Sequence, residues 1–167
     1  AKNKLYFSYL NMIKPQTLKG FRDFLPQTMA IRSRVINILK EVFEKYGFSE
    51  LQTPTLEYAE VLTGKYGEEA EKLMYLFKDQ GDRQVGLKYD LTVPLARVMA
   101  QYPNLSKPFK RYQIQPVFRA ENTQKGRYRE LYQCDIDTVG TVSLSADAEI
   151  LAVISDSLQA LGFTNFT

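Results

Sequence analysis

One short segment carries residues whose types and spacing suit nucleotide chemistry. Arg119 and Glu121 stand two positions apart at the end of an alternating run, and Arg127 and Arg129 follow after a polar turn that contains Gly126. Because residues two apart on a strand face the same way, we expect Arg119 and Glu121 to point into one space, with the two later arginines arriving from across the turn. Guanidinium groups suit phosphate oxygens, and a carboxylate suits an amine donor. The segment therefore predicts a site that holds a nucleotide by its phosphates and its base.

The surrounding sequence places this segment at the tip of a predicted β-hairpin, with strands over residues 110–121 and 128–139. One face of the pair collects hydrogen-bonding side chains, namely Gln113, Gln115, Arg119 and Glu121 from the first strand and Gln133, Asp135 and Asp137 from the second. Two interpretations stay open on this pattern. The face is either the wet side of an ordinary antiparallel sheet, where an exposed Arg–Glu pair contributes under about 1 kcal/mol, or the floor of a polar pocket.

The composition excludes several classes of site. The chain has no histidine, which rules out Ser-His-Asp triads, Cys-His pairs and His-ligated metals. The single cysteine, Cys134, cannot form an internal disulfide, which fits a reducing compartment, and its place in the alternation predicts a buried strand thiol. Any proton transfer must therefore use carboxylates or the substrate itself.

The charge gives only a local indication of a partner. The net charge of +3 makes a weak case for nucleic-acid binding by the whole protein. Residues 107–130 hold seven Lys or Arg and two acidic residues, which is either a binding patch or a solvated turn. No apolar run approaches the roughly 20 residues of a membrane span, so we expect no membrane partner and a cytoplasmic protein.

The length and spacing predict one α+β domain over residues 18–167, preceded by an extension over residues 1–17. A helix is expected over residues 28–46, with Thr28 as N-cap and Gly47 as its end, followed by a strand over residues 48–53. This pair either forms a dimer face or packs on its own domain. Further along we expect a short helix and loop over residues 57–72, strands over 75–77 and 84–88, helices over 90–101 and 145–161, and a new strand from 163. For the helix that ends at residue 101, the N-cap is either Asp90 or Thr92.

Together these segments resemble the class II aminoacyl-tRNA synthetases, and more narrowly the histidyl-tRNA synthetase family. Residues 20–26, which read Gly-Phe-Arg-Asp-Phe-Leu-Pro, resemble the opening signature of that family. The long helix and the strand before Pro54 resemble motif 1, which builds the dimer interface, and residues 118–130 resemble motif 2 with its Gly-Arg-Tyr-Arg loop. Residues 89–97 and 132–137 resemble the two histidine-pocket segments. The match covers residues 18–167, with five segments in the right order.

The resemblance implies a six- or seven-stranded antiparallel sheet flanked by helices, not a Rossmann fold. It implies a ligase that activates histidine with ATP and Mg²⁺, transfers it to tRNA(His) and works as a homodimer. By position, Arg119 is the catalytic residue on the ATP α-phosphate and the histidine carboxylate, Glu121 faces the adenine amine, and Arg127 reaches the terminal phosphate. The implied histidine-binding residues are Asp90, Leu91, Thr92 and Gln133 around the α-ammonium, and Asp137 on the imidazole side.

The resemblance stops before class II motif 3, the second histidine-enzyme signature and the anticodon-binding domain. We therefore expect residues 18–167 to hold about half of the active site and to activate histidine weakly or undetectably alone. Other functions stay open, including a regulatory subunit of histidine biosynthesis, a tRNA-sensing domain and a bare dimerisation module. The regulatory and sensing proteins need not make an adenylate and are expected to lose motif 2. That motif is intact here, which ranks the ligase first.

Overall fold

The computed structural model describes residues 14–63 and 71–166. Its helices are α2 (Pro26–Lys45), α3 (Ala59–Leu62), α5 (Thr92–Gln101) and α6 (Leu144–Ala160). Its strands are β1 (Ser49–Glu50), β2 (Leu56–Tyr58), β3 (Leu76–Lys78), β4 (Gln84–Leu87), β5 (Phe109–Phe118) and β6 (Glu130–Val139). Most of the predicted extension over residues 1–17 and part of the loop predicted within residues 57–72 lie outside the described residues, so the domain boundaries stay a prediction.

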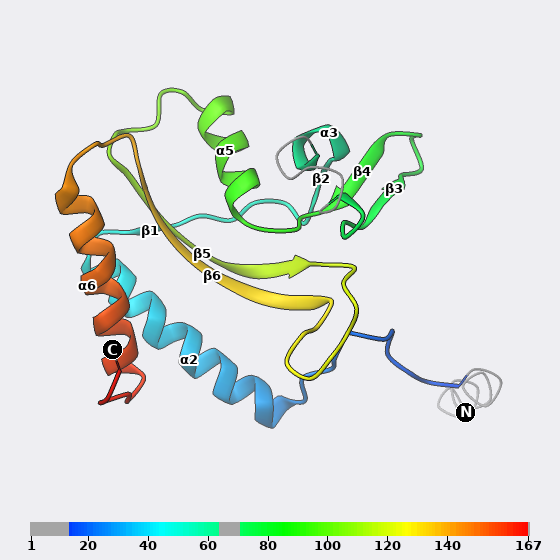
Figure 1. Cartoon of the computed structure of the whole chain (residues 1–167), viewed down its shortest axis with the longest axis horizontal. Coiled ribbons are helices and arrows are strands. Elements are labelled where there is room, and N and C mark those ends of the chain that lie inside the picture. Colours follow the sequence, from blue (N-terminus) through cyan, green and yellow to red (C-terminus); the bar gives the residue numbers. More distant parts are fainter. Residues whose placement is uncertain (1–13, 64–70, 167) are drawn as a thin grey trace, which may run out of the picture.

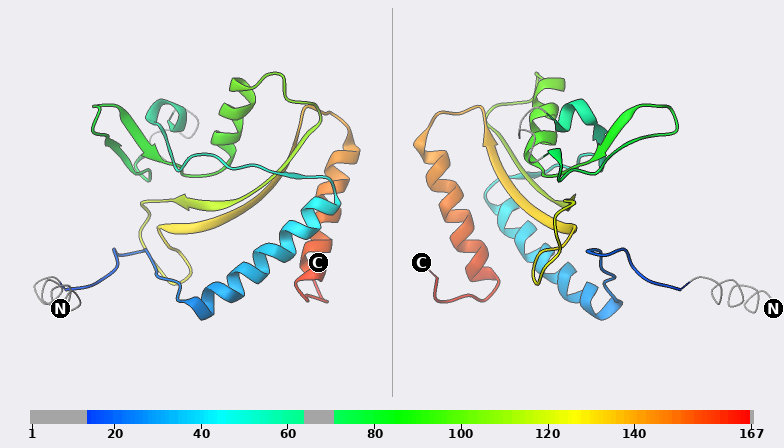
Figure 2. Two further views of the ribbon diagram at one scale, coloured as in Figure 1. Left: turned by 180° about the vertical axis from the view of Figure 1, so that it is seen from behind. Right: turned by 45° about the vertical axis from the view of Figure 1, so that its right-hand side comes forward.

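The arrangement is the predicted α+β class, with helices flanking a long antiparallel hairpin. Figure 1 shows the curved β5–β6 hairpin with α2 and α6 on one side and α5, α3 and the smaller sheet on the other. The view from behind in Figure 2 shows α2 and α6 side by side across the same face of the hairpin. The hairpin therefore separates an apolar layer from a layer of loops and short elements.

The sheet itself differs from the single antiparallel sheet that the resemblance implied. Within the described residues, β1, β5 and β6 form one three-stranded sheet, and β2, β4 and β3 form another. β1 pairs with β5 in parallel, whereas β5 pairs with β6 antiparallel over ten residues. The parallel pair is possible because the long connection between β1 and β5 lets the chain return to the same end of the sheet.

The element boundaries follow local backbone chemistry more closely than the predicted caps. α2 begins at Pro26 rather than after Thr28, since proline presets the helical φ and its missing N–H is not needed in the first turn. Gly47 ends this helix at φ +77°, as predicted. The strand predicted over residues 48–53 shrinks to Ser49–Glu50, and residues 163–166 form no strand.

The core lies between the hairpin and the two long helices. Val42 and Phe43 of α2, Tyr112 of β5 and Val153 of α6 are buried against one another, with Phe48 completing the cluster. The hydroxyl of Tyr112 donates to Glu44 at 2.8 Å, which satisfies its polar end at the edge of the core. The second half of α2 thus packs on its own domain. In its first half Ile31 remains 68% exposed, and dimer formation stays a prediction.

We expect Val153→Ala to lower the free energy of unfolding by about 2–3 kcal/mol, because it removes two fully buried methyl groups and leaves a cavity. Leu151→Ala on the same helix removes more carbon but starts from a side chain that is 69% exposed, so its effect should stay within about 0.5 kcal/mol. Urea unfolding of the two variants measures the difference. Equal losses would show that α6 does not pack as described.

Candidate active site

The polar face of the hairpin is present as the sequence predicted. Register places Gln113 opposite Asp135 and Gln115 opposite Gln133, and residues directly opposite share a face. The face is not wet along its length, because Gln113 has no exposed surface and donates to the Thr53 hydroxyl at 2.8 Å. The interpretation as an ordinary solvated face is therefore wrong for the middle of the hairpin.

Arg119, Glu121 and Arg127 line one hollow of about 210 Å³ at the loop end of the hairpin. Within it, Nε of Arg127 lies 3.0 Å from Oε2 of Glu121. The sequence predicted that a strand over residues 110–121 would carry both Arg119 and Glu121 on one face. This prediction is wrong, because β5 ends at Phe118 and neither residue lies on the strand. The amide of Arg119 still donates to the Arg129 carbonyl at 2.9 Å, but the next amide, of Ala120, donates to the Leu73 carbonyl at 2.8 Å and takes the chain away from β6.

Arg119 and Arg129 were both predicted to point into this space, and only Arg119 does so. Arg119 is held beside the connection between β4 and α5, where its Nε donates to the Tyr89 carbonyl at 3.3 Å and its guanidinium lies 4.8 Å from the centre of the Tyr89 ring. Arg129 points to backbone instead of into the hollow, and its Nε donates to the Glu121 carbonyl at 3.1 Å. Of the two arginines after the turn, only Arg127 lines the hollow.

A second cluster, which we call the acidic cluster, consists of Asp90, Asp135 and Asp137 around Arg111. Arg111 has no exposed surface, and one of its terminal nitrogens lies 2.7 Å from Oδ2 of Asp137. Burial lowers the pKa of Arg111, and the charges of Asp137, Asp135 and Asp90 oppose that shift. Burial also raises the pKa of Asp135, against the opposing charge of Arg111. These mutual effects place the three carboxyl groups and the guanidinium in one electrostatic neighbourhood.

The predicted histidine-binding residues relate to this cluster in different ways. Gln133 joins it by donating to Asp135 at 3.0 Å. Asp90 accepts the Val93 amide in the first turn of α5 at 3.1 Å, but the N-cap itself is Leu91, and not Asp90 or Thr92 as the sequence predicted. Leu91 is fully buried and Thr92 is exposed at the first residue of α5. The roles of Leu91 and Thr92 therefore rest on the resemblance alone, while Asp90, Gln133 and Asp137 are brought together.

The sequence did not single out two buried cations of this face. Arg111 stands two residues before Gln113 and so lies on the same polar face of the strand. This spacing is the sequence signal that could have identified it. Lys88, just after β4, has no exposed surface and donates to Oε1 of Gln115 at 2.9 Å and to the Thr53 carbonyl at 3.3 Å. Burial lowers the pKa of Lys88 to about 8, and the nearby Glu57 carboxylate opposes the shift.

The prediction that Cys134 is buried is wrong, because its side chain is exposed as a free thiol. In the described residues β6 is an edge strand of its sheet, and the helices cover the neighbouring Ile114 and Ile136 instead.

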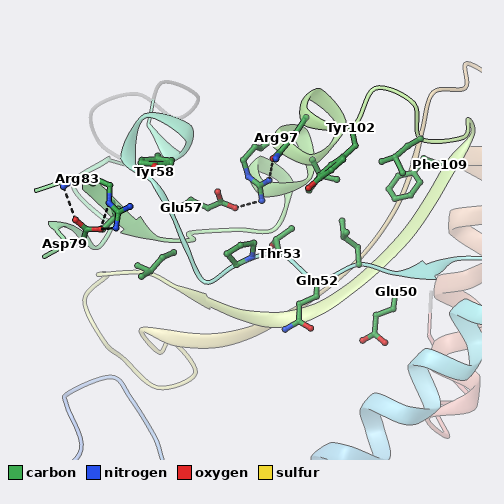
Figure 3. A pocket seen from close by; sticks show the side chains of 17 residues that line it. Glu50, Gln52, Thr53, Glu57, Tyr58, Asp79, Arg83, Arg97, Tyr102 and Phe109 are labelled. Carbon is green, nitrogen blue, oxygen red and sulfur yellow. Dashed lines mark hydrogen bonds and ion pairs between the residues drawn. The ribbon is translucent and has the colours of Figure 1, made fainter. Parts of the chain in front are cut away.

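A larger hollow, of about 890 Å³, lies elsewhere, between α5 and the segment that joins β1 to β2. Figure 3 shows two ion pairs among its side chains, with Glu57 directed at Arg97 and Asp79 beside Arg83. None of the predicted site residues lines it. Its size alone does not make it the site, since the convergent polar groups lie in the smaller hollow and the acidic cluster.

Two searches of the described residues found nothing further. No helix among residues 14–63 and 71–166 is both long and apolar enough to cross a membrane. The same residues contain no group of three or more acidic or cysteine side chains with the geometry to hold a metal ion.

We expect Lys88→Met to remove a pH dependence of stability between pH 8 and pH 10. Lys88 has a pKa of about 8 when folded and an ordinary lysine pKa near 10.5 when unfolded. Between these values the unfolded chain binds more protons, so the contribution of Lys88 to the free energy of unfolding rises with pH, by about 1–3 kcal/mol. From pH 8 to pH 10, urea unfolding should show the free energy of unfolding of the wild type rising relative to that of Lys88→Met. It should not rise relative to that of the control Lys78→Met, which changes an exposed lysine. A constant difference between wild type and Lys88→Met would contradict this.

Comparisons with known proteins show which family the chain resembles in sequence and fold. A sequence model described as histidyl-tRNA synthetase matches residues 20–167. A histidine–tRNA ligase of Rhodopirellula baltica is 52% identical over 157 residues, which cover 93% of this chain and 36% of that protein. The crystal structure of histidyl-tRNA synthetase from Nostoc sp. PCC 7120 superposes with a TM-score of 0.79 at 35% identity, covering 90% of this chain and 35% of that one.

A Bacillus halodurans structure described as an ATP phosphoribosyltransferase regulatory subunit/histidyl-tRNA synthetase has a TM-score of 0.80 at 24% identity, covering 92% of this chain and 40% of that one. At this identity the likeness shows the fold alone. The chain spans about a third of the length of the curated relatives it matches. The match of the family model over nearly the whole chain shows that this protein belongs to the histidyl-tRNA synthetase family.

Proposed function

We propose that this chain provides the ATP-binding and histidine-binding half of the active site of a histidine–tRNA ligase. The observation that carries the proposal is that Arg119 contacts Tyr89, the neighbour of Asp90, so the hollow with Arg119, Glu121 and Arg127 adjoins the acidic cluster. Under this proposal the whole protein uses Mg²⁺ with ATP, acts on tRNA(His), and works as a homodimer in the cytoplasm. The family membership and the names of the relatives support it.

The hollow suits ATP by the types of its groups. Arg119 would contact the α-phosphate, and its contacts with Tyr89 fix the plane of the guanidinium before the substrate arrives. Glu121 would accept from the adenine amine, and Arg127, whose side chain is 58% exposed, would turn toward the terminal phosphate. Mg²⁺ would be carried mainly by the phosphate oxygens, because the described residues offer no cluster of metal ligands.

The proposed reaction needs no nucleophile from the protein. A carboxylate oxygen of histidine attacks the α-phosphorus, a new oxygen–phosphorus bond forms, and the bond to the leaving pyrophosphate breaks. Negative charge grows on the α-phosphate oxygens in the transition state, and a fixed guanidinium at Arg119 stabilises that charge more than it stabilises the ground state. The absence of histidine from the chain is therefore compatible with this chemistry.

The acidic cluster suits the amino acid. Asp137 contacts the buried guanidinium of Arg111, and the charges of Asp135 and Asp90 also act on it, so the cluster favours a ligand that brings positive charge or N–H donors. The α-ammonium and the imidazole of histidine supply both. A ligand without the imidazole N–H would leave Asp137 without its ligand partner, and rejecting such a ligand is how a polar pocket gains selectivity.

We expect Asp137→Asn to weaken histidine binding by roughly 10- to 150-fold, since a charge-assisted hydrogen bond contributes about 1.5–3 kcal/mol. Isothermal calorimetry of histidine binding to the two proteins measures the change. Asp82→Asn is the matched control, because Asp82 lies in an exposed turn with a positive φ that asparagine also adopts. Equal affinity of wild type and Asp137→Asn would remove Asp137 from the pocket.

We expect Arg119→Gln to lower the rate of ATP–pyrophosphate exchange by roughly 30- to 1,000-fold in a catalytically complete form of the protein, because the lost stabilisation is about 2–4 kcal/mol. Arg127→Gln should have a smaller effect, since its side chain is exposed and acts far from the reacting phosphorus. The chain over residues 18–167 alone should show weak or no exchange. Exchange by Arg119→Gln at the wild-type rate would refute the assignment of Arg119.

A further inference from the structure

The segment over residues 18–22 has no part in the proposed chemistry, yet it lies against the loop that carries Glu121 and Arg127. Figure 1 shows the N-terminal segment passing beside the loop between β5 and β6. We propose that residues 18–22, the clasp segment, position the loop over residues 119–130, and that Gly20 is the positioning residue. The value of this for ATP rests on the proposed function, but the geometric claim does not.

The backbone of the clasp segment requires glycine. The amide of Phe21 donates to the Leu18 carbonyl at 2.9 Å, which closes a four-residue turn, and Gly20 occupies its third position at φ +90°. A positive φ at this position is the property of a type II turn and is unfavourable for residues with a Cβ. The turn aims the Gly20 carbonyl at the loop, where it accepts the Arg129 amide at 2.9 Å.

The space around Gly20 is closed by both arms of the loop. A Cβ at this position would lie 2.7 Å from Cγ2 of Thr123 on the outgoing arm, and 2.7 Å from Cγ and 2.8 Å from Cδ of Arg129 on the returning arm. Real side chains essentially never approach so closely, so the loop would have to move. Gly20 is thus the point at which the two arms and the clasp segment meet.

Arg129 and Arg22 extend this contact to the residues that would bind ATP. Arg129 donates from Nε to the Glu121 carbonyl at 3.1 Å and from a terminal nitrogen to the Lys19 carbonyl at 3.5 Å. The guanidinium of Arg22 lies 3.2 Å from the centre of the Tyr128 ring, next to Arg127 in the chain. The backbone at Glu121 and the ring beside Arg127 are therefore each held from the clasp side.

The loop needs such support because few bonds of its own fix its shape. Among the described residues, the backbone bonds inside the loop are the Gln124–Arg127 bridge and the bond from the Arg119 amide to the Arg129 carbonyl at its base, and side-chain bonds tie Glu121 to Arg127 and Arg129. A loop with so little internal pairing samples many conformations, and ordering it at the moment of binding costs affinity. Contacts from the clasp segment supply that order in advance.

The experiment is NMR hydrogen exchange on Gly20→Ala. We expect the amides of Arg127 and Arg129 to exchange at least tenfold faster than in wild type, while the amides of β4 keep their rates. The Nε–H signal of Arg127, which lies 3.0 Å from Oε2 of Glu121, should shift toward the position of an unpaired arginine. A general loss of stability would speed exchange throughout the fold, so this local pattern separates positioning from destabilisation.

Gly162→Ala is the matched control. Gly162 has φ +93°, and a Cβ there would meet nothing within 4 Å, so the variant carries the same backbone strain without the clash. It should leave the exchange of Arg127 and Arg129 unchanged. The proposal is overturned if Gly20→Ala leaves the loop amides as protected as in wild type, or if Gly162→Ala exposes them equally.

Arg22→Leu and Arg22→Lys keep the proposal testable should Gly20→Ala fail to fold. The leucine variant removes the cation from the Tyr128 ring and should speed exchange at Arg127 at least threefold, and lysine should restore part of the protection. If the Arg127 amide of Arg22→Leu exchanges at the wild-type rate, the contact between Arg22 and the Tyr128 ring does not position the loop.

Titration with ATP then tests the proposed function separately. If the function is right, Gly20→Ala should weaken ATP binding at least tenfold and leave histidine binding unchanged. Absence of ATP binding in wild type would count against the proposed function, while the clasp would still be judged by exchange. Equal ATP affinity in wild type and Gly20→Ala would show that the clasp does not serve nucleotide binding.

Discussion

The register of β5 against β6 is the constraint on which both the core and the candidate site depend. Tyr112 pairs with Ile136 on the apolar face, and one position away Arg111 pairs with Asp137 on the polar face. Because side chains alternate, a slip of one residue on β5 would turn Arg111 toward the core and Tyr112 toward the pocket. The core specifies the register through the fit of Tyr112 against Phe43, and the site is formed by the same choice.

Two buried cations give the polar face its arrangement at a cost to stability. Arg111 and Lys88 have no exposed surface, and burial lowers the pKa of both groups. A buried charge is tolerated where oxygen atoms face it, as Asp137 faces Arg111 and Gln115 faces Lys88. Apolar residues of similar volume commonly give equal or greater stability than such pairs. Stability alone therefore does not account for these buried charges. Holding polar groups in place for a ligand accounts for them better.

The sequence predicted those parts of the fold that local spacing controls. The 3.6-residue period found α5 and α6 to within one or two residues, and the period of two found the shared polar face of Gln115 and Gln133. It could not predict where β5 ends, because that depends on the bond from Ala120 to Leu73, which is distant in the chain. It also misjudged the burial of Cys134, which is exposed on an edge strand, and it did not single out Arg111, which has no exposed surface.

The connection between β4 and α5 joins the two parts of the site. Lys88 accepts the Phe118 amide with its carbonyl at 2.9 Å, Tyr89 receives Arg119, and Asp90 accepts the Val93 amide at the start of α5. Three consecutive residues are therefore fixed to the hairpin, to Arg119 and to a helix. Adenylate formation requires the attacking oxygen and the phosphorus to approach within about 3–3.5 Å. Under the proposed function, a short connection anchored at both ends would keep the acidic cluster and Arg119 at a constant separation, so that histidine and ATP would be bound by different elements and still meet in line.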